Sequence, residues 1–322
     1  MTGLKDKNIV LIGGGSGNAA LLRGLKNYTD NITVLVNVVD DGGSSGRIRQ
    51  NIDMIPPGDI RNCLVALADD DNEMTSIVAR RFDDGTISNE SLGNLLFVAL
   101  YEIPKDYLKT IDTIRNILSV KAMVLPVTTD CIRLAAVLEN GDRVVGQSII
   151  SSESVLRDSP VEHIELIPRD VSLLEECRRA IRQAHVIIYS PGSLYTSLMP
   201  DLLVGDIAEE LENASAVRIL MANAMSEHGE TDGYSVSDIV RAVEKHIDGR
   251  KIIDAVIYNT SPIPEEITER YTAEGASPIM VDIDEELLSR YDFIGDDIIN
   301  ISTGTVRHDA DKLWRILEEL NI

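Results

Sequence analysis

The sequence predicts an α/β fold with a mostly parallel sheet flanked by helices. Three observations favour this class. Short apolar runs alternate with helical patterns along most of the chain. Polar, glycine-containing segments follow directly after several of these runs, as expected for loops at the carboxyl ends of parallel strands. Residues 121–168 depart from this alternation and contain several short strand patterns, which predict a small antiparallel β insertion.

The first strand, loop and helix are expected near the start of the chain. The apolar run 9–12 breaks into a glycine-rich segment, and a helical pattern follows. Glycine lets backbone N–H groups approach a phosphate, and a helix start directs unpaired N–H groups and its positive dipole end to the same place. This order is typical of a Rossmann-like phosphate cradle, although a tight turn without a ligand is also compatible with it. The candidate ligand-binding residues are Gly13, Gly14, Gly15, Ser16, Gly17 and Asn18.

The second strand, expected at 32–39, ends in the acidic, glycine-rich segment 40–47. Asp40 and Asp41 are candidate Mg²⁺ ligands, because Mg²⁺ prefers a few carboxylates together with phosphate oxygens and water. Alternatively, one aspartate recognises a ribose or caps the loop and the other is solvated. The candidate ligand-binding residues of this segment are Asp40, Gly42, Gly43 and Ser44.

Two further helix starts contribute polar candidates. Residues 56–62 lead from two prolines and a glycine into a helix. Asp59 is either a plain N-cap or a ligand contact, and with Asp40 and Asp41 it is a candidate catalytic residue. Asn62 in the same turn and Asn94, within the apolar helical pattern 92–102, are candidate ligand-binding residues. Other helices are expected at 73–82 and 107–118.

Residues 121–168 are predicted to form the β-rich insertion. Its strands are expected at 122–127, 133–138, 144–149 and 163–167, with a hairpin turn at 139–142 (Glu-Asn-Gly-Asp). No linker or low-complexity segment interrupts the chain. Residues 1–322 are therefore predicted to form a single α/β nucleotide-binding domain that contains this insertion.

The α/β alternation then resumes to the end of the chain. Helices are expected at 171–183, 203–211, 236–246 and 265–274, and strands at 186–189, 217–222, 252–258 and near 298–301, before a last helix with Trp314. Polar loops again follow the strands, and a row of such loops at one edge predicts a long crevice for an extended ligand. The loop after 186–189 is equally compatible with a capped turn. These loops supply Gly192, Ser193, Thr196, Asn223 and Asn259 as candidate ligand-binding residues.

Composition limits the classes of partner. The 322 residues are 44% hydrophobic and 26% charged, with a formal net charge of -23. Such a charge argues against nucleic-acid binding and against attraction to anionic membranes. A phosphate site therefore needs local compensation. The sequence contains no apolar run of membrane-spanning length and no signal-peptide core, and its three cysteines are far apart, so a cytoplasmic location is expected.

Seven segments carry longer motifs: 12–17, 40–47, 56–67, 91–96, 191–197, 229–234 and 306–309. Together they resemble the gluconeogenesis-factor family, within the superfamily that includes 2-phospho-L-lactate transferase. The resemblance implies a Rossmann-like fold that binds a UDP-sugar such as UDP-N-acetylglucosamine, and a regulatory role that links carbon metabolism to bacterial cell shape and wall synthesis. It also implies that Tyr271 and Arg307 contact the nucleotide sugar. Glu90 stands where relatives usually carry His, and Ser190 where they often carry Gly.

Two functions follow as hypotheses. The first is a nucleotide-sugar-binding regulator, in which the glycine loops hold a diphosphate and Arg307 supplies positive charge. The second is a Mg²⁺-dependent transferase that moves a phosphoryl-linked group from a nucleotide donor. An NAD-like dinucleotide is an alternative ligand for the same loops. A homo-oligomer and protein partners from cell-wall synthesis or regulation are compatible with either function.

Overall fold

The protein is built around a seven-stranded parallel sheet. The computed structural model describes residues 3–82 and 89–320, apart from the side chain of Ser16. The strand order is β3-β2-β1-β7-β8-β9-β10, and each neighbouring pair is parallel. The order reverses between β1 and β7, which creates the crevice where ligands bind in open α/β sheets. The strands are β1 (Ile9–Ile12), β2 (Ile32–Val36), β3 (Met123–Pro126), β7 (Val186–Tyr189), β8 (Val217–Met221), β9 (Ala255–Asn259) and β10 (Asp292–Asp296).

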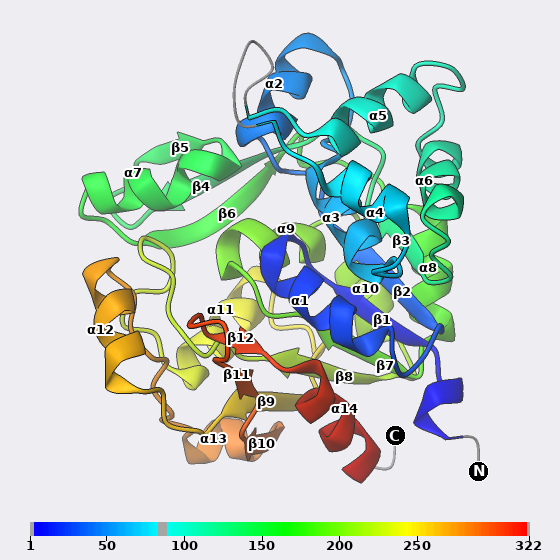
Figure 1. Ribbon diagram of the computed structural model, residues 1–322. Coiled ribbons are helices and arrows are strands. Elements are labelled where there is room, and N and C mark those ends of the chain that lie inside the picture. Colours follow the sequence, from blue (N-terminus) through cyan, green and yellow to red (C-terminus); the bar gives the residue numbers. More distant parts are fainter. Residues whose placement is uncertain (1–2, 83–88, 321–322) are drawn as a thin grey trace.

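Helices flank this sheet, so the predicted Rossmann-like fold is confirmed (Figure 1). The first and last long helices, α1 and α14, pack side by side, and the Tyr28 and Trp314 rings stack with centroids 4.8 Å apart. This contact ties the end of the chain to the first strand–helix unit. The helices are α1 (Gly15–Leu25), α2 (Gly43–Asn51), α3 (Gly58–Leu67), α4 (Glu73–Ala79), α5 (Leu92–Tyr101), α6 (Tyr107–Ile117), α7 (Ile150–Leu156), α8 (Glu175–Gln183), α9 (Met199–Leu202), α10 (Ile207–Glu212), α11 (Val236–His246), α12 (Glu265–Ala273), α13 (Glu285–Leu288) and α14 (Ala310–Glu319).

The insertion is a three-stranded antiparallel sheet that stands beside the main sheet (Figure 1). Its order is β5-β4-β6, with β4 at Arg133–Leu138, β5 at Arg143–Val145 and β6 at Val161–Ile167. The predicted hairpin turn joins β4 to β5. The strand expected at 122–127 exists as β3, but its assignment to the insertion is wrong. β3 pairs in parallel with β2 and therefore belongs to the main sheet. An apolar run of that length has the same local pattern in either sheet, and only its pairing partner distinguishes them.

The strand expected at 144–149 is wrong after Val145. Gly146 has a φ of 132°, and a 3₁₀ turn at Gln147–Ile149 leads into α7. Both carboxylate oxygens of Asp41 accept hydrogen bonds there, from the N–H of Gln147 at 3.0 Å and of Ser148 at 2.8 Å. A contact with Asp41, about a hundred residues earlier in the sequence, therefore ends this strand.

Three other expectations differ from the structure. The segment 40–47 is only partly a loop, because α2 begins at Gly43. The strand expected near 298–301 is not the last strand of the main sheet, because β10 takes that place. Instead, β11 (Ile299–Asn300) pairs with β12 (Arg307–His308) in a separate small hairpin. The helices expected at 73–82, 171–183 and 203–211 are shorter, as α4, α8 and α10. Within the described residues, the chain forms no helix with the length and apolar character needed to cross a membrane.

Candidate functional site

The candidate site lies where β1 and β7 end, at the reversal of strand order. The first turn of α1 packs there against the loop after β7. A Cβ atom built on Gly17 would lie 2.3 Å from the carbonyl oxygen of Pro191, so only glycine allows the two backbones to come this close. Gly15 adopts a φ of 72°, which a residue with a side chain rarely takes. The glycine-rich segment is therefore required by the local geometry.

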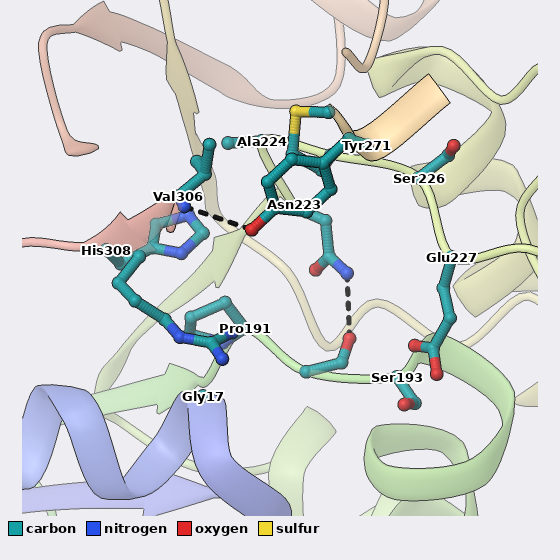
Figure 2. A pocket seen from close by; sticks show the side chains of 13 residues that line it. Gly17, Pro191, Ser193, Asn223, Ala224, Ser226, Glu227, Tyr271, Val306 and His308 are labelled. Carbon is teal, nitrogen blue, oxygen red and sulfur yellow. Dashed lines mark hydrogen bonds between the residues drawn. The ribbon is translucent and has the colours of Figure 1, made fainter. Parts of the chain in front are cut away.

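A pocket of about 280 Å³ opens at this point (Figure 2). Its walls come from α1, from the loops after β7 and β8, from α12 and from the β12 hairpin. Gly17 and Arg307 line the same pocket, as the diphosphate hypothesis requires. The lining residues are Gly17, Pro191, Gly192, Ser193, Asn223, Ala224, Met225, Ser226, Glu227, Tyr271, Val306, Arg307 and His308.

The wall that carries Arg307 is held by two hydrogen bonds. The Tyr271 hydroxyl accepts from the N–H of Val306 at 3.0 Å, and His308 Nε2 lies 3.1 Å from the carbonyl oxygen of Ala222. Burial lowers the pKa of His308 to about 4, so its imidazole is neutral at physiological pH and donates to that carbonyl. Arg307 itself is exposed, and no ion pair or side-chain hydrogen bond is found for it within residues 3–82 and 89–320. Its guanidinium is thus available to an anion.

Asn223 joins the loops after β7 and β8. Its side-chain amide donates to the carbonyl oxygen of Gly192 at 2.8 Å (Figure 2). Together with Ala224 it also lines a second pocket of about 370 Å³. Asn259 lies in this second pocket, where its amide donates to the carbonyl of Ser261 and its oxygen accepts from the N–H of Ser261. An elongated ligand that passes Asn223 would therefore reach both pockets.

Two carboxylates lie on the other side of the α1 turn. Asp59 Oδ2 would be 2.7 Å from a Cβ atom on Gly14, and Asp40 Oδ2 would be 2.5 Å from one on Gly58. Burial, and next the negative charge of Asp40, raise the pKa of Asp59 to about 7. Asn62 accepts a hydrogen bond from Arg61 at 2.5 Å in the same helix turn. Asp40 and Asp59 thus form an acidic pair beside the glycine turn, whereas Asp41 is engaged by the backbone of the insertion.

Ser44 and Asn94 lie in a buried polar cluster near this acidic pair. The Ser44 hydroxyl donates to Glu90 at 2.7 Å and accepts from the Asn94 amide at 3.1 Å, and Arg47 pairs with Glu90. Asp40 Oδ1 accepts from the N–H of Gly42 at 3.0 Å, which shapes the turn into Gly43 at the start of α2. These residues support the loop after β2.

Two further sequence candidates have structural partners instead of a place in the pocket wall. The buried Asn18 amide donates to the carbonyl oxygen of Gly13 at 2.8 Å and closes the glycine turn. The Thr196 hydroxyl donates to Glu230 at 2.8 Å. The Ser16 side chain lies outside the described part of the structure.

Sequence reasoning did not single out Glu227 or Glu230, which lie in the loop after β8. Glu227 lines the pocket, and Glu230 is 3% exposed. Burial raises the pKa of Glu227, and burial together with the Glu227 charge raises that of Glu230 to about 7. A sequence signal exists, because both acids lie within two residues of Gly229 in a polar loop that follows a predicted strand.

Comparisons with known proteins agree with this fold over nearly its whole length. The family model described as 2-phospho-L-lactate transferase CofD matches residues 9–298. The chain is 38% identical over 319 residues to the gluconeogenesis factor of Bacillus subtilis, covering 99% of each protein. It is also 38% identical over 317 residues to that of Halalkalibacterium halodurans, covering 98% of this chain and 97% of the relative. The crystal structure of a protein from Bacillus halodurans superposes with a TM-score of 0.92 at 37% identity, covering 97% of this chain and 99% of that one.

Proposed function

Because this chain belongs to the gluconeogenesis factor family, with a fold of the 2-phospho-L-lactate transferase type, we propose that it is a nucleotide-sugar-binding regulatory protein. The proposed ligand is a UDP-sugar such as UDP-N-acetylglucosamine. The proposed role links carbon metabolism to cell shape and wall synthesis. One observation carries this proposal: Gly17, the loop Pro191-Gly192-Ser193 and the available Arg307 line a single pocket.

The chemistry of this pocket suits a diphosphate. Backbone N–H groups at the start of α1 and the helix dipole attract negative charge, and Arg307 offers charge-assisted hydrogen bonds. These local groups compensate for a net charge of -23, which repels a phosphorylated ligand at long range. Asn223, Tyr271 and the second pocket extend the polar wall for the base, ribose or sugar.

Calorimetric titration of the full chain tests the proposal. We expect UDP-N-acetylglucosamine to bind with measurable heat, and NAD to bind more weakly because its nicotinamide riboside half offers fewer hydroxyl donors than N-acetylglucosamine, in a different arrangement. If neither UDP-sugars nor NAD bind at millimolar concentration, the proposed function is wrong.

The acidic pair supports a second candidate, the Mg²⁺-dependent transferase of a phosphoryl-linked group. Asp40 and Asp59 would hold the ion, which takes its remaining ligands from water and phosphate oxygens. Bound Mg²⁺ supplies charge neutralisation at the phosphates. Within the described residues, no group of three or more His, Cys, Asp or Glu gathers in a metal-binding arrangement, but two carboxylates are enough for such a phosphate-assisted site.

The raised pKa of Asp59 makes this metal site testable by pH. Mg²⁺ requires the ionised carboxylate, so its affinity should rise about tenfold per pH unit up to the pKa of about 7 and level off above it. Asp59→Asn should remove that dependence, measured by calorimetry. The pKa of Asp59 in the folded protein lies above the usual aspartate value of 3.8, so wild-type stability falls as pH rises between these values. Asp59→Asn should therefore melt at a higher temperature than wild type at about pH 8. A flat affinity profile in the wild-type protein would rule out Asp59 as the ligand.

A further inference from the structure

The two sides of the pocket differ in charge, and binding of a diphosphate alone does not explain this difference. Figure 2 shows Gly17, Pro191 and His308 on one side and Glu227 with Ser226 on the other. One side therefore offers the start of α1, while the other presents a carboxylate. The guanidinium of Arg307 lines the same pocket.

Glu227 and Glu230 differ in how their carboxylates are used. Glu230 accepts hydrogen bonds from the Ser151 hydroxyl at 3.0 Å, the Tyr195 N–H at 3.1 Å and the Thr196 hydroxyl at 2.8 Å. It therefore joins the insertion to the turn after β7. In the described part of the chain, Ser193 is the side chain that hydrogen-bonds to the Glu227 carboxylate. A carboxylate has about four acceptor positions, so Glu227 has acceptor capacity that faces the pocket.

We propose that Glu227 recognises the hydroxyl-bearing part of the ligand, accepting hydrogen bonds from sugar or ribose hydroxyls. This inference rests on the proposed function and deepens it. A phosphate placed against Glu227 would meet a like charge in a partly desolvated pocket, which is unfavourable. The diphosphate is thus directed to Gly17 and Arg307, and the neutral donor groups to Glu227. Glu227 would then determine both the orientation of the ligand and its specificity, because a ligand without donors leaves a buried carboxylate unpaired.

Glu227→Gln tests this assignment, because it keeps the shape of the side chain and removes its charge. We expect the dissociation constant of UDP-N-acetylglucosamine to rise about 10-fold, the difference between a charged and a neutral acceptor. Binding of inorganic pyrophosphate, which has no sugar, should stay the same or become tighter. Glu266→Gln is the matched control, since it removes one charge from an exposed position on α12 outside the pocket wall and should leave both affinities unchanged.

The outcomes separate this inference from the proposed function. Equal affinity of wild type and Glu227→Gln for UDP-N-acetylglucosamine overturns the inference and leaves the proposed function standing. An equal loss of pyrophosphate and nucleotide-sugar binding also overturns it, because Glu227 would then act on the whole pocket. If the wild-type protein binds pyrophosphate but no hydroxyl-bearing nucleotide, both the proposed function and the inference are wrong.

Discussion

Replacing Arg307 with alanine should weaken binding of UDP-N-acetylglucosamine by about 10- to 100-fold. A hydrogen bond to a charged group contributes about 1.5–3 kcal/mol, which corresponds to that range of dissociation constants. Because no partner holds the Arg307 side chain within the described residues, its loss should leave the melting temperature unchanged. Calorimetric titration and thermal unfolding of the same samples measure the two effects.

Two further variants make the Arg307 result interpretable. Arg23→Ala removes an exposed positive charge from α1 outside the pocket wall, and should leave the affinity within about twofold of wild type, because surface charges act weakly at a distance. Arg307→Lys should bind with intermediate affinity, since lysine keeps the charge but loses the planar fork of donors. Wild-type affinity in Arg307→Ala would contradict the placement of the diphosphate.

Gly17→Ala should affect both binding and stability. The added methyl group would lie 2.3 Å from the carbonyl oxygen of Pro191, so α1 and the loop after β7 must move apart. Overpacking of this kind typically costs about 1–3 kcal/mol of unfolding free energy. The displacement also moves the helix start that faces the phosphate, so we expect nucleotide-sugar binding to fall below detection by calorimetry, together with a lower melting temperature.

Gly3→Ala is the control for this substitution. No atom lies within 4 Å of a Cβ built on Gly3, so the same change should leave stability and binding near wild type. If Gly17→Ala binds and melts like the wild-type protein, then the close approach of α1 to Pro191 does not shape the pocket.

The local patterns in the sequence predicted the strands and glycine turns near the site. The order of strand, glycine segment and helix at the start of the chain requires only nearest-neighbour chemistry, and the structure has it in β1 and α1. The hairpin turn between β4 and β5 was predictable for the same reason. The strand expected to end at Ile149 failed because Asp41, from a distant loop, caps the backbone of Gln147 and Ser148. No window of sequence around Val145 contains that information.

The residues of the candidate site also divide into those that the sequence predicted and those that only the structure revealed. Gly17 and Arg307 were predicted to lie together, and they line one pocket. Thr196 and Asn18 are polar residues in the expected loops, but their side chains bind Glu230 and the backbone of Gly13. Asp59, instead of Asp41, faces Asp40, because α3 brings its first turn against the glycine turn.

The sequence by itself therefore determined the α/β class, the family and the loops that carry the chemistry, because periodicity, glycine positions and motif order are local properties. Only the tertiary structure decided which carboxylates and hydroxyls line the pocket. A polar side chain in a loop has several partners within reach, and the choice among them depends on elements that approach from far along the chain. Glu227 in the pocket wall and the buried Glu230, three residues apart in sequence but different in their surroundings, are the clearest example.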